Sequence, residues 1–169
     1  MEEVILVDSS DTPIGTMEKL EAHRLGVLHR AFSVVLRNSK GEMLLQKRAD
    51  EKYHSGGLWT NTCCSHPLPG ESVPEAASRR LKQEMGIHLS PEELEHRGYF
   101  VYKTAFPNGL TEHELDHLLV GTWESDPELN SSEASDFKWI DIYELKKEIN
   151  INPDTFTFWF REMISRDLI

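Results

Sequence analysis

The dipeptide Asn108-Gly109 is the feature that most constrains the fold of this chain. Asn-Gly is the strongest short-range signal for a β-hairpin, because both residues tolerate the positive φ that a two-residue hairpin turn requires. The segment before it, HRGYFVYKTAF at 96–106, is rich in aromatic and β-branched residues. We therefore expect a strand at 96–106 and its antiparallel return strand at 111–123.

This hairpin decides how the sequence HELDH at 113–117 is interpreted. On a helix, the pattern H-E-x-x-H holds the zinc ion of a metallopeptidase. On a strand, His113 and His117 would lie about 13 Å apart, because each residue advances the chain by ~3.3 Å. The strand therefore excludes that zinc site. Its alternation places Glu112, Glu114 and Asp116 on one face, which is either solvated or part of a site.

Length and charge limit the class of protein. The 169 residues predict one domain spanning 1–169, and no apolar run approaches the ~20 residues that cross a bilayer. The first ten residues are acidic and lack the basic region of a signal peptide, so we expect a cytoplasmic protein without a membrane partner. The net charge of −11 argues against a nucleic-acid partner. We expect a monomer.

The remaining pattern indicates strands and helices in mixed order. Short apolar or β-branched runs predict strands at 3–7, 28–37 and 42–48, the last two joined as a hairpin. Residues 73–86 predict the clearest helix, with Pro74 near its start and Gly86 at its end. A helix start is expected at 90–95, and further helices at 141–149 and 154–165. The fold class is α+β: a mixed β-sheet flanked by helices in an α/β/α layered domain.

The adjacent pair Cys63 and Cys64 is unusual. Neighbouring Cα atoms are only ~3.8 Å apart, which is shorter than the span of a disulfide, so these thiols are free, ligating or reactive. In the extended segment WTNTCCSHP, Cys64 and His66 point to the same side. Cys63 then points to the other side, where we expect it to pack in the core.

Four segments of the chain, taken together, resemble a known protein family. The segments are EKLEAHRLGVLHRAFSVVL, WTNTCCSHP, ASRRLKQEMGI and TEHE, and the resemblance extends from about residue 3 to FTFWF at 156–160. They resemble the type I isopentenyl-diphosphate isomerases of the Nudix superfamily. The resemblance implies a Nudix fold and conversion of isopentenyl diphosphate to dimethylallyl diphosphate in isoprenoid biosynthesis. That reaction protonates one end of an alkene and removes a proton from the other side, through a carbocation.

The same resemblance implies roles for individual residues. Cys64 and Glu114 match the two acid/base groups, and Tyr102 matches the tyrosine that assists Glu114. Trp159 matches the tryptophan whose π face steadies the cation. The commoner role of an aromatic residue such as Trp159 on a helix is core packing, and that interpretation stays open.

Metal and substrate ligands are implied in the same way. The set His23, His29, His66, Glu112 and Glu114 matches a divalent metal site suited to Zn²⁺ or Mn²⁺. Glu84 and the backbone carbonyl of Cys64 match the ligands of a Mg²⁺ bound with the substrate diphosphate. Lys19, Arg48, Lys52 and Arg80 match the diphosphate-binding side chains, although each could also be a solvated surface charge. The segment that carries His23 and His29 is loop-like, and we expect it to order when metal or substrate binds.

Two other functions compete with the isomerase. A Nudix diphosphohydrolase would use several helix carboxylates to gather metals that activate water. Here Glu84 is kept, whereas Arg80 and Gln83 replace two of the glutamates and Ser65 replaces the opening glycine. A non-catalytic Nudix-fold protein is the third possibility. The joint presence of Cys64 and Glu114 favours the isomerase over both.

Overall fold

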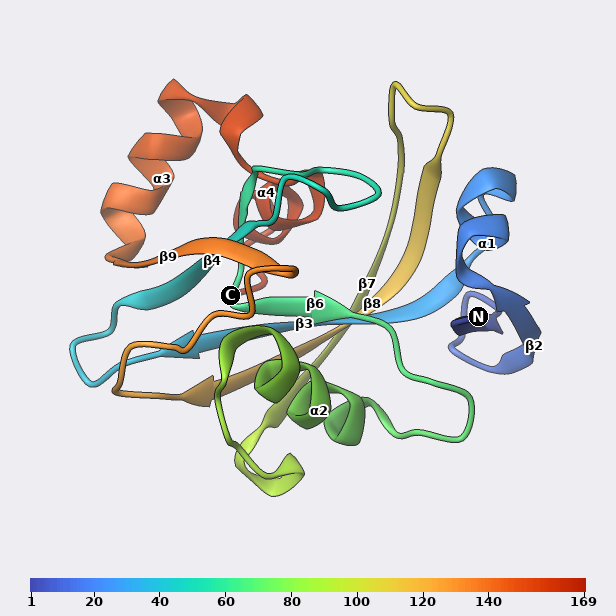
Figure 1. Ribbon diagram of the computed structural model, residues 1–169, viewed down its shortest axis with the longest axis horizontal. Helices are drawn as coiled ribbons and strands as arrows, with labels where there is room; N and C mark the ends of the chain where they lie inside the picture. The colour runs from blue at the N-terminus through green and yellow to red at the C-terminus, as the bar shows by residue number, and fades with distance from the viewer.

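The computed structural model describes residues 1–169 as a nine-stranded sheet with helices on both sides (Figure 1). The strands are β1 (Glu3–Val7), β2 (Pro13–Glu18), β3 (His29–Arg37), β4 (Met43–Arg48), β5 (Trp59–Thr60), β6 (Cys63–Ser65), β7 (Glu95–Ala105), β8 (Thr111–Thr122) and β9 (Ala134–Ile140). The helices are α1 (Lys19–Leu25), α2 (Val73–Met85), α3 (Ile142–Ile151) and α4 (Phe158–Ser165). Short 3₁₀ turns occupy Pro91–Glu93 and Pro153–Thr155.

Strand β3 is the centre of the sheet. It pairs in parallel with β8, from His29 opposite Glu114 to Arg37 opposite Thr122. The expected hairpin of β7 and β8 forms, but its connection is the loop 106–110 rather than a two-residue turn, and of the Asn-Gly pair only Gly109 has a positive φ. The other expected hairpin opens early, because β3 and β4 pair only at Arg37 and Met43. Beyond that point β3 pairs with β6, while β4 pairs with β5 and β9.

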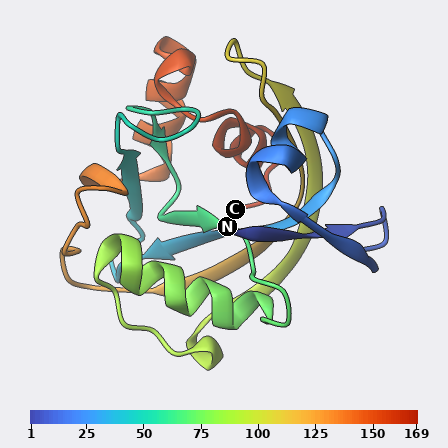
Figure 2. The same ribbon diagram turned by 45° about the vertical axis from the view of Figure 1, so that its right-hand side comes forward.

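Helices cover both faces of the sheet, which confirms the α+β layered fold. Helix α2 lies on one face, and α3 and α4 lie on the other (Figures 1 and 2). Strand β3 is buried on both sides and supplies both cores: Phe32 packs in the cluster that contains Leu81 of α2, and Val35 packs in the cluster that contains Phe160 of α4. A strand covered on both faces needs such continuous apolar character.

Helix α2 begins and ends as its sequence predicts. The Ser72 hydroxyl accepts a hydrogen bond from the Glu75 backbone N–H, and the Glu75 carboxylate accepts one from the Ser72 N–H. This capping box satisfies two amides that would otherwise lack partners. Gly86 ends the helix with φ +63°, the left-handed conformation that glycine adopts at least cost.

Several local expectations were wrong. Residues 91–93 form only a single 3₁₀ turn, although the Ser90 N–H donates to Glu93 as in a helix start. The last helix begins at Phe158 rather than 154. The segment that carries His23 is not loop-like, because the Glu18 carboxylate caps helix α1 and Gly26 ends it. Strands β2 and β9 were not expected from the sequence. No helix is both long and apolar enough to cross a membrane.

Replacing Gly86 by alanine should destabilise the protein by about 2 kcal/mol or more. The new Cβ would meet the backbone oxygen of Glu128 at 2.8 Å in addition to the strain of positive φ. Gly109→Ala is the control, because its φ is +85° but nothing lies within 4 Å of the added atom. Urea unfolding should show the larger loss for Gly86→Ala, and equal losses would contradict the close contact with Glu128.

Candidate active site

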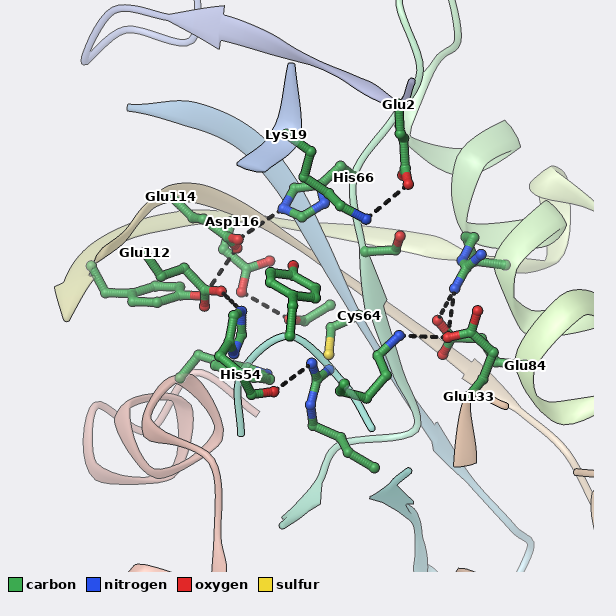
Figure 3. Close-up of a pocket in the computed structure, with 18 residues that line it drawn as sticks. Glu2, Lys19, His54, Cys64, His66, Glu84, Glu112, Glu114, Asp116 and Glu133 are labelled. Atoms are coloured by element: carbon green, nitrogen blue, oxygen red, sulfur yellow. Dashed lines mark hydrogen bonds and ion pairs between the residues drawn. The ribbon is translucent and has the colours of Figure 1, made fainter. Parts of the chain in front are cut away.

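A polar cavity lies between β8, β6, α1, α2, α4 and the loop at 49–58 (Figure 3). Of the 18 residues that line it, only 4 are hydrophobic. In Figure 3 the side chains of Glu112, Glu114 and Asp116 lie on one side of Cys64, and Glu84 and Glu133 lie on the other. The cavity therefore presents two acidic groups with a thiol between them.

The carboxylates of β8 are buried, so the interpretation as a solvated face is wrong. Glu112, Glu114 and Asp116 are 3%, 6% and 1% exposed, and all three line the cavity. Leu115 points to the opposite face and packs with Ile5 of β1. The alternation of a strand, together with pairing to β3 and β7, thus places three carboxyl groups inside the protein.

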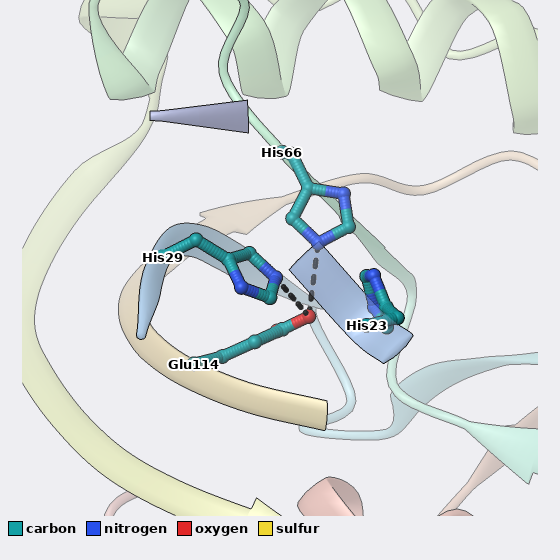
Figure 4. A group of neighbouring side chains, drawn as sticks. All are labelled: His23, His29, His66 and Glu114. Atoms are coloured by element: carbon teal, nitrogen blue, oxygen red, sulfur yellow. Dashed lines mark hydrogen bonds and ion pairs between the residues drawn. The ribbon is translucent and has the colours of Figure 1, made fainter. Parts of the chain in front are cut away.

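Three imidazole rings surround the Glu114 carboxylate (Figure 4). His29 is paired directly with Glu114 across β3 and β8, and its Nε2 lies 3.4 Å from Oε1. The Nε2 of His66 lies 2.9 Å from the same oxygen. His23, from α1, completes the group, and its Nε2 lies 3.6 Å from Oε2 of Glu112. We call these residues, His23, His29, His66, Glu112 and Glu114, the cage.

The tautomers of two rings suit a bound cation. Nδ1 of His23 lies 2.7 Å from the Lys19 carbonyl, and Nδ1 of His29 lies 2.9 Å from the Val27 carbonyl. A carbonyl only accepts, so each Nδ1 carries a proton and donates. Both Nε2 atoms are buried without a hydrogen-bond partner and are directed into the cage. Metal-binding histidines are typically oriented by such second hydrogen bonds, and the cage is compatible with a divalent metal ion.

The electrostatics of the cage also favour a positive charge there. Burial alone would raise the pKa of Glu114, but the His66 and His29 rings lower it well below its usual value. The pKa of Glu112 is likewise lowered, by His54 and His23, against burial and the charge of Glu114. Burial opposes protonation of His23, yet the two glutamates raise its pKa above the usual value. A cation in the cage would compete with that proton.

Tyr102 connects the two glutamates of the cage. It is opposite Glu114 on β7, and its hydroxyl contacts both carboxylates, with Glu114 Oε2 at 2.9 Å and Glu112 closer still. Burial and the neighbouring charges of Glu112 and Glu114 raise the pKa of Tyr102 well above its usual value. The phenol therefore keeps its proton, and its single O–H acts as a hydrogen-bond donor shared between the two carboxylates.

The two cysteines point in opposite directions, as strand alternation predicts. Cys64 lines the cavity, and the buried Cys63 packs in the core beneath α2, where its thiol donates to Glu84 at 3.3 Å. Burial raises the pKa of the Cys64 thiol strongly, and the nearby Arg48 only partly opposes this shift. Cys64 is consequently a neutral thiol at physiological pH.

Four basic side chains line the same cavity: Lys19, Arg48, Lys52 and Arg80. They are not freely solvated. The Lys52 ammonium lies 2.6 Å from Glu133, and the Arg80 guanidinium lies 2.5 Å from Glu84 and 3.2 Å from Glu133. Glu84 is buried and also accepts a hydrogen bond from the Gln46 amide at 3.0 Å. This end of the cavity therefore combines cationic side chains with the Glu84 carboxylate, which is fixed by Gln46 and Arg80.

Trp159 occupies two environments. It is 2% exposed and packs in the core with its neighbours on α4, yet it also lines the cavity. The Arg48 guanidinium lies 5.3 Å from the centre of its ring, and the Tyr102 ring is stacked 6.5 Å away. Packing and a cavity role are therefore compatible.

The predicted site residues all converge. His23 and His29 belong to the cage, and every other predicted residue lines the cavity. Sequence reasoning missed further lining residues, among them Ser33, Tyr53, His54, Asp116 and Glu133. Strand alternation placed Asp116 on the same face as the two glutamates but gave it no role in the site. Nothing in the sequence of the polar loop distinguished His54.

Asp116 differs from its two neighbours on β8. Its Oδ2 accepts a hydrogen bond from the Ser33 hydroxyl at 2.8 Å, and its Oδ1 is buried without a partner. Burial and the nearby Glu114 charge raise the pKa of Asp116 well above its usual value. Three carboxyl groups close together in a buried site cannot all ionise readily, and here Asp116 keeps the proton.

Comparisons with known proteins agree with this geometry. The NUDIX domain model matches residues 27–160. Isopentenyl-diphosphate Delta-isomerase 2 of Aromatoleum aromaticum is 47% identical, over 98% of this chain and 86% of the relative. The protein of the same name from Photorhabdus laumondii is 45% identical, over 98% and 92%. The crystal structure of DR0079 from Deinococcus radiodurans superimposes with a TM-score of 0.77 and 21% identity, covering 98% of each chain, which shows the fold alone.

Divalent cations should stabilise the protein against unfolding. Because the cage exists only in the folded state, Zn²⁺ at 100 times its dissociation constant should add about 2.7 kcal/mol to the free energy of unfolding. His29→Gln should lose most of this gain, since it removes a ring from the cage. His88→Gln is the matched control, because His88 is exposed and outside the cage. Equal Zn²⁺ stabilisation of both variants, measured by urea unfolding, would exclude the cage as the metal site.

The Cys64 thiol should resist alkylation near neutral pH. Its pKa is raised, so the reactive thiolate is scarce below the raised pKa and increases as pH approaches it. A Cys63→Ala variant isolates Cys64. Iodoacetamide at pH 8 should label the folded variant at least about ten times more slowly than the same chain in urea. A folded-state rate equal to the urea rate would contradict a neutral, buried thiol.

Proposed function

The chain belongs to the isopentenyl-diphosphate Delta-isomerase family of Nudix-domain proteins, and from this premise we propose that it converts isopentenyl diphosphate to dimethylallyl diphosphate. One observation carries the proposal: a neutral thiol, Cys64, and a carboxylate, Glu114, line the same buried cavity. Such an isomerisation needs two groups that exchange protons with carbon from different sides of the substrate.

Cys64 and Glu114 divide the two proton transfers between them. A proton adds to the terminal carbon of the alkene, leaving positive charge on the tertiary carbon, and a proton then leaves the carbon on the diphosphate side to form the new double bond. No net proton is gained or lost. The Tyr102 hydroxyl donates to Glu114 at 2.9 Å, so it orients this carboxylate and moderates its basicity. After each turnover one of the two groups has lost a proton and the other has gained one. A proton must pass back between them before the next turnover.

Trp159 and the buried carboxylates suit the intermediate. An aromatic face attracts a cation by about 2 kcal/mol or more in a desolvated site. The Arg48 guanidinium lies 5.3 Å from the centre of the Trp159 ring, which supports a role for this ring beside positive charge. Exclusion of bulk water also protects a tertiary carbocation from capture.

The basic end of the cavity is our proposed diphosphate site. Lys19, Arg48, Lys52 and Arg80 would contact the phosphate oxygens, replacing the ion pairs that Lys52 and Arg80 make with Glu133. Release from Arg80 would leave a carboxylate oxygen of Glu84 available to a Mg²⁺ that binds with the diphosphate. The backbone carbonyl of Cys64 is the second proposed protein ligand of this ion.

The cage is the proposed site of a second divalent cation, Zn²⁺ or Mn²⁺. Three imidazoles with two carboxylates suit these ions better than Mg²⁺, which prefers oxygen ligands. When bound, the cation supplies positive charge that holds the Glu112 and Glu114 carboxylates in place. His66 contributes to the cage from the strand segment that also carries Cys64, so the cage and the thiol are positioned together.

Hydrolysis of a diphosphate is less well supported. A hydrolase needs several helix carboxylates, but Arg79 and Arg80 both donate to Gln83 on this helix face, and Glu71 is bound by Arg79. Of these positions, only Glu84 presents a carboxylate to the cavity. The monomeric state and the absence of a nucleic-acid partner remain predictions from the sequence.

Isomerisation can be tested directly in D₂O. We expect the protein, with isopentenyl diphosphate, Mg²⁺ and Mn²⁺, to form deuterated dimethylallyl diphosphate, followed by proton and phosphorus NMR. Cys64→Ala and Glu114→Gln should each reduce the rate by at least about 10²-fold, because general acid–base groups contribute that much or more. Cys63→Ala is the matched control and should retain most activity.

Two outcomes would overturn the proposal. Unchanged substrate with the wild-type protein, although Mn²⁺ is bound, would exclude the isomerase. Release of inorganic phosphate in the same spectra would instead favour a Nudix hydrolase. Circular dichroism of each variant separates loss of a catalytic group from loss of the fold.

A further inference from the structure

His54 is a buried imidazole for which sequence reasoning gave no role. It lies in the loop at 49–58 between β4 and β5 and is 5% exposed. Its ring is stacked on Phe106 with the ring centroids 4.4 Å apart, and it makes a T-shaped contact with Tyr53, centroid to centroid 4.3 Å. The ring is thus held firmly beside the cage, and Figure 3 shows it directed toward Glu112.

His54 is in direct contact with Glu112 of the cage. Nε2 of His54 lies 2.6 Å from Oε2 of Glu112, yet this nitrogen has no properly directed hydrogen bond. A nitrogen lone pair and a carboxylate oxygen repel at this distance unless positive charge lies between or beside them. A proton on Nε2 would also remove this repulsion, and a metal ion bound there would take the place of that proton.

His54 and the cage converge on one residue. The side chains of His23, His54 and Glu112 each offer a ligand atom, and these three atoms lie within 4.8 Å of one another. His23 is also the shared member of the group with His29, His66 and Glu114. Nδ1 of His23 donates to the Lys19 carbonyl, so its single free nitrogen, Nε2, can serve only one ion.

Charge balance argues for one cation rather than two. The cage holds two ionised carboxylates, those of Glu112 and Glu114, and one divalent cation neutralises them. A second divalent cation would leave excess positive charge in a buried site, which is costly. We therefore assign the ligand atoms of both groups that share His23 to a single metal-binding site.

We infer that His54 is a fourth imidazole ligand of the cation bound in the cage, an inference that rests on the proposed metal site. Nδ1 of His54 lies 3.1 Å from the Ser55 hydroxyl oxygen, which can accept a hydrogen bond from a protonated Nδ1 and so leave Nε2 free for the metal. Ligation by His54 ties the loop at 49–58 to the cage. The same loop carries Lys52, and its carbonyl at His54 accepts a hydrogen bond from Arg48 at 3.1 Å. Metal loading thereby fixes the loop beside the proposed diphosphate site.

The competing role for His54 is that of an outer-shell donor to Glu112. Both roles would lower metal affinity when the ring is removed, so affinity does not separate them. The number of coordinated imidazoles does. High-spin Co²⁺ shifts the ring N–H proton of each bound histidine far outside the usual proton NMR range, giving one exchangeable resonance per ligated ring.

The experiment uses the full chain loaded with one equivalent of Co²⁺ in H₂O. We expect four such resonances for the wild type, from His23, His29, His54 and His66, and three for His54→Gln. His88→Gln should keep all four. The wild-type count needs no variant, so the test stands even if His54→Gln fails to fold.

Other counts overturn the inference in distinguishable ways. Three shifted resonances in the wild type, unchanged in His54→Gln, would make His54 an outer-shell residue while the proposed cage stands. An absence of shifted resonances, with no Co²⁺ retained after gel filtration, would overturn the cage and the inference together.

Discussion

Parallel pairing of β3 with β8 is the constraint on which the rest of the structure depends. Its first pair places His29 directly opposite Glu114, so one backbone ladder sets the central contact of the cage. Parallel neighbours cannot be joined by a tight turn. The connection between them, residues 38–110, contains the loop at 49–58, β6 and α2, and it therefore carries Cys64 and Arg80 back to the same cavity.

The cavity separates two electrostatic tasks. Around Glu114, buried carboxylates and three imidazole rings form a site that favours positive charge. At the other end, Lys52 and Arg80 form ion pairs with Glu133 and are suited to bind an anionic group. Cys64 lies between the two ends as a neutral thiol (Figure 3). A substrate with an anionic head and an apolar, proton-exchanging tail matches this order.

Sequence predicted much of this arrangement because its main signals are local. Asn108-Gly109 fixed the hairpin, the hairpin fixed which β8 side chains face inward, and Gly86 ended α2 at the expected residue. The family resemblance supplied the residues that converge on the cavity. Local pattern could not show that Glu112 and its neighbours on that face are buried, since burial there comes from pairing with β3 and β7 and from the layer of helices. His54 could not be predicted as a site residue for the same reason. Only the folded structure brings its polar loop against Glu112.

A crystal structure with one equivalent of Zn²⁺, together with Mg²⁺ and inorganic pyrophosphate, tests the central claim most directly. We expect an anomalous zinc peak within the cage, bound by Nε2 of His29 and His66, and pyrophosphate separately bound by Lys52 and Arg80, with the Cys64 thiol between them. Zinc bound outside the cage, or pyrophosphate bound to the zinc with no contact to Lys52 and Arg80, would contradict the division of the cavity into a metal-bearing end and a diphosphate end.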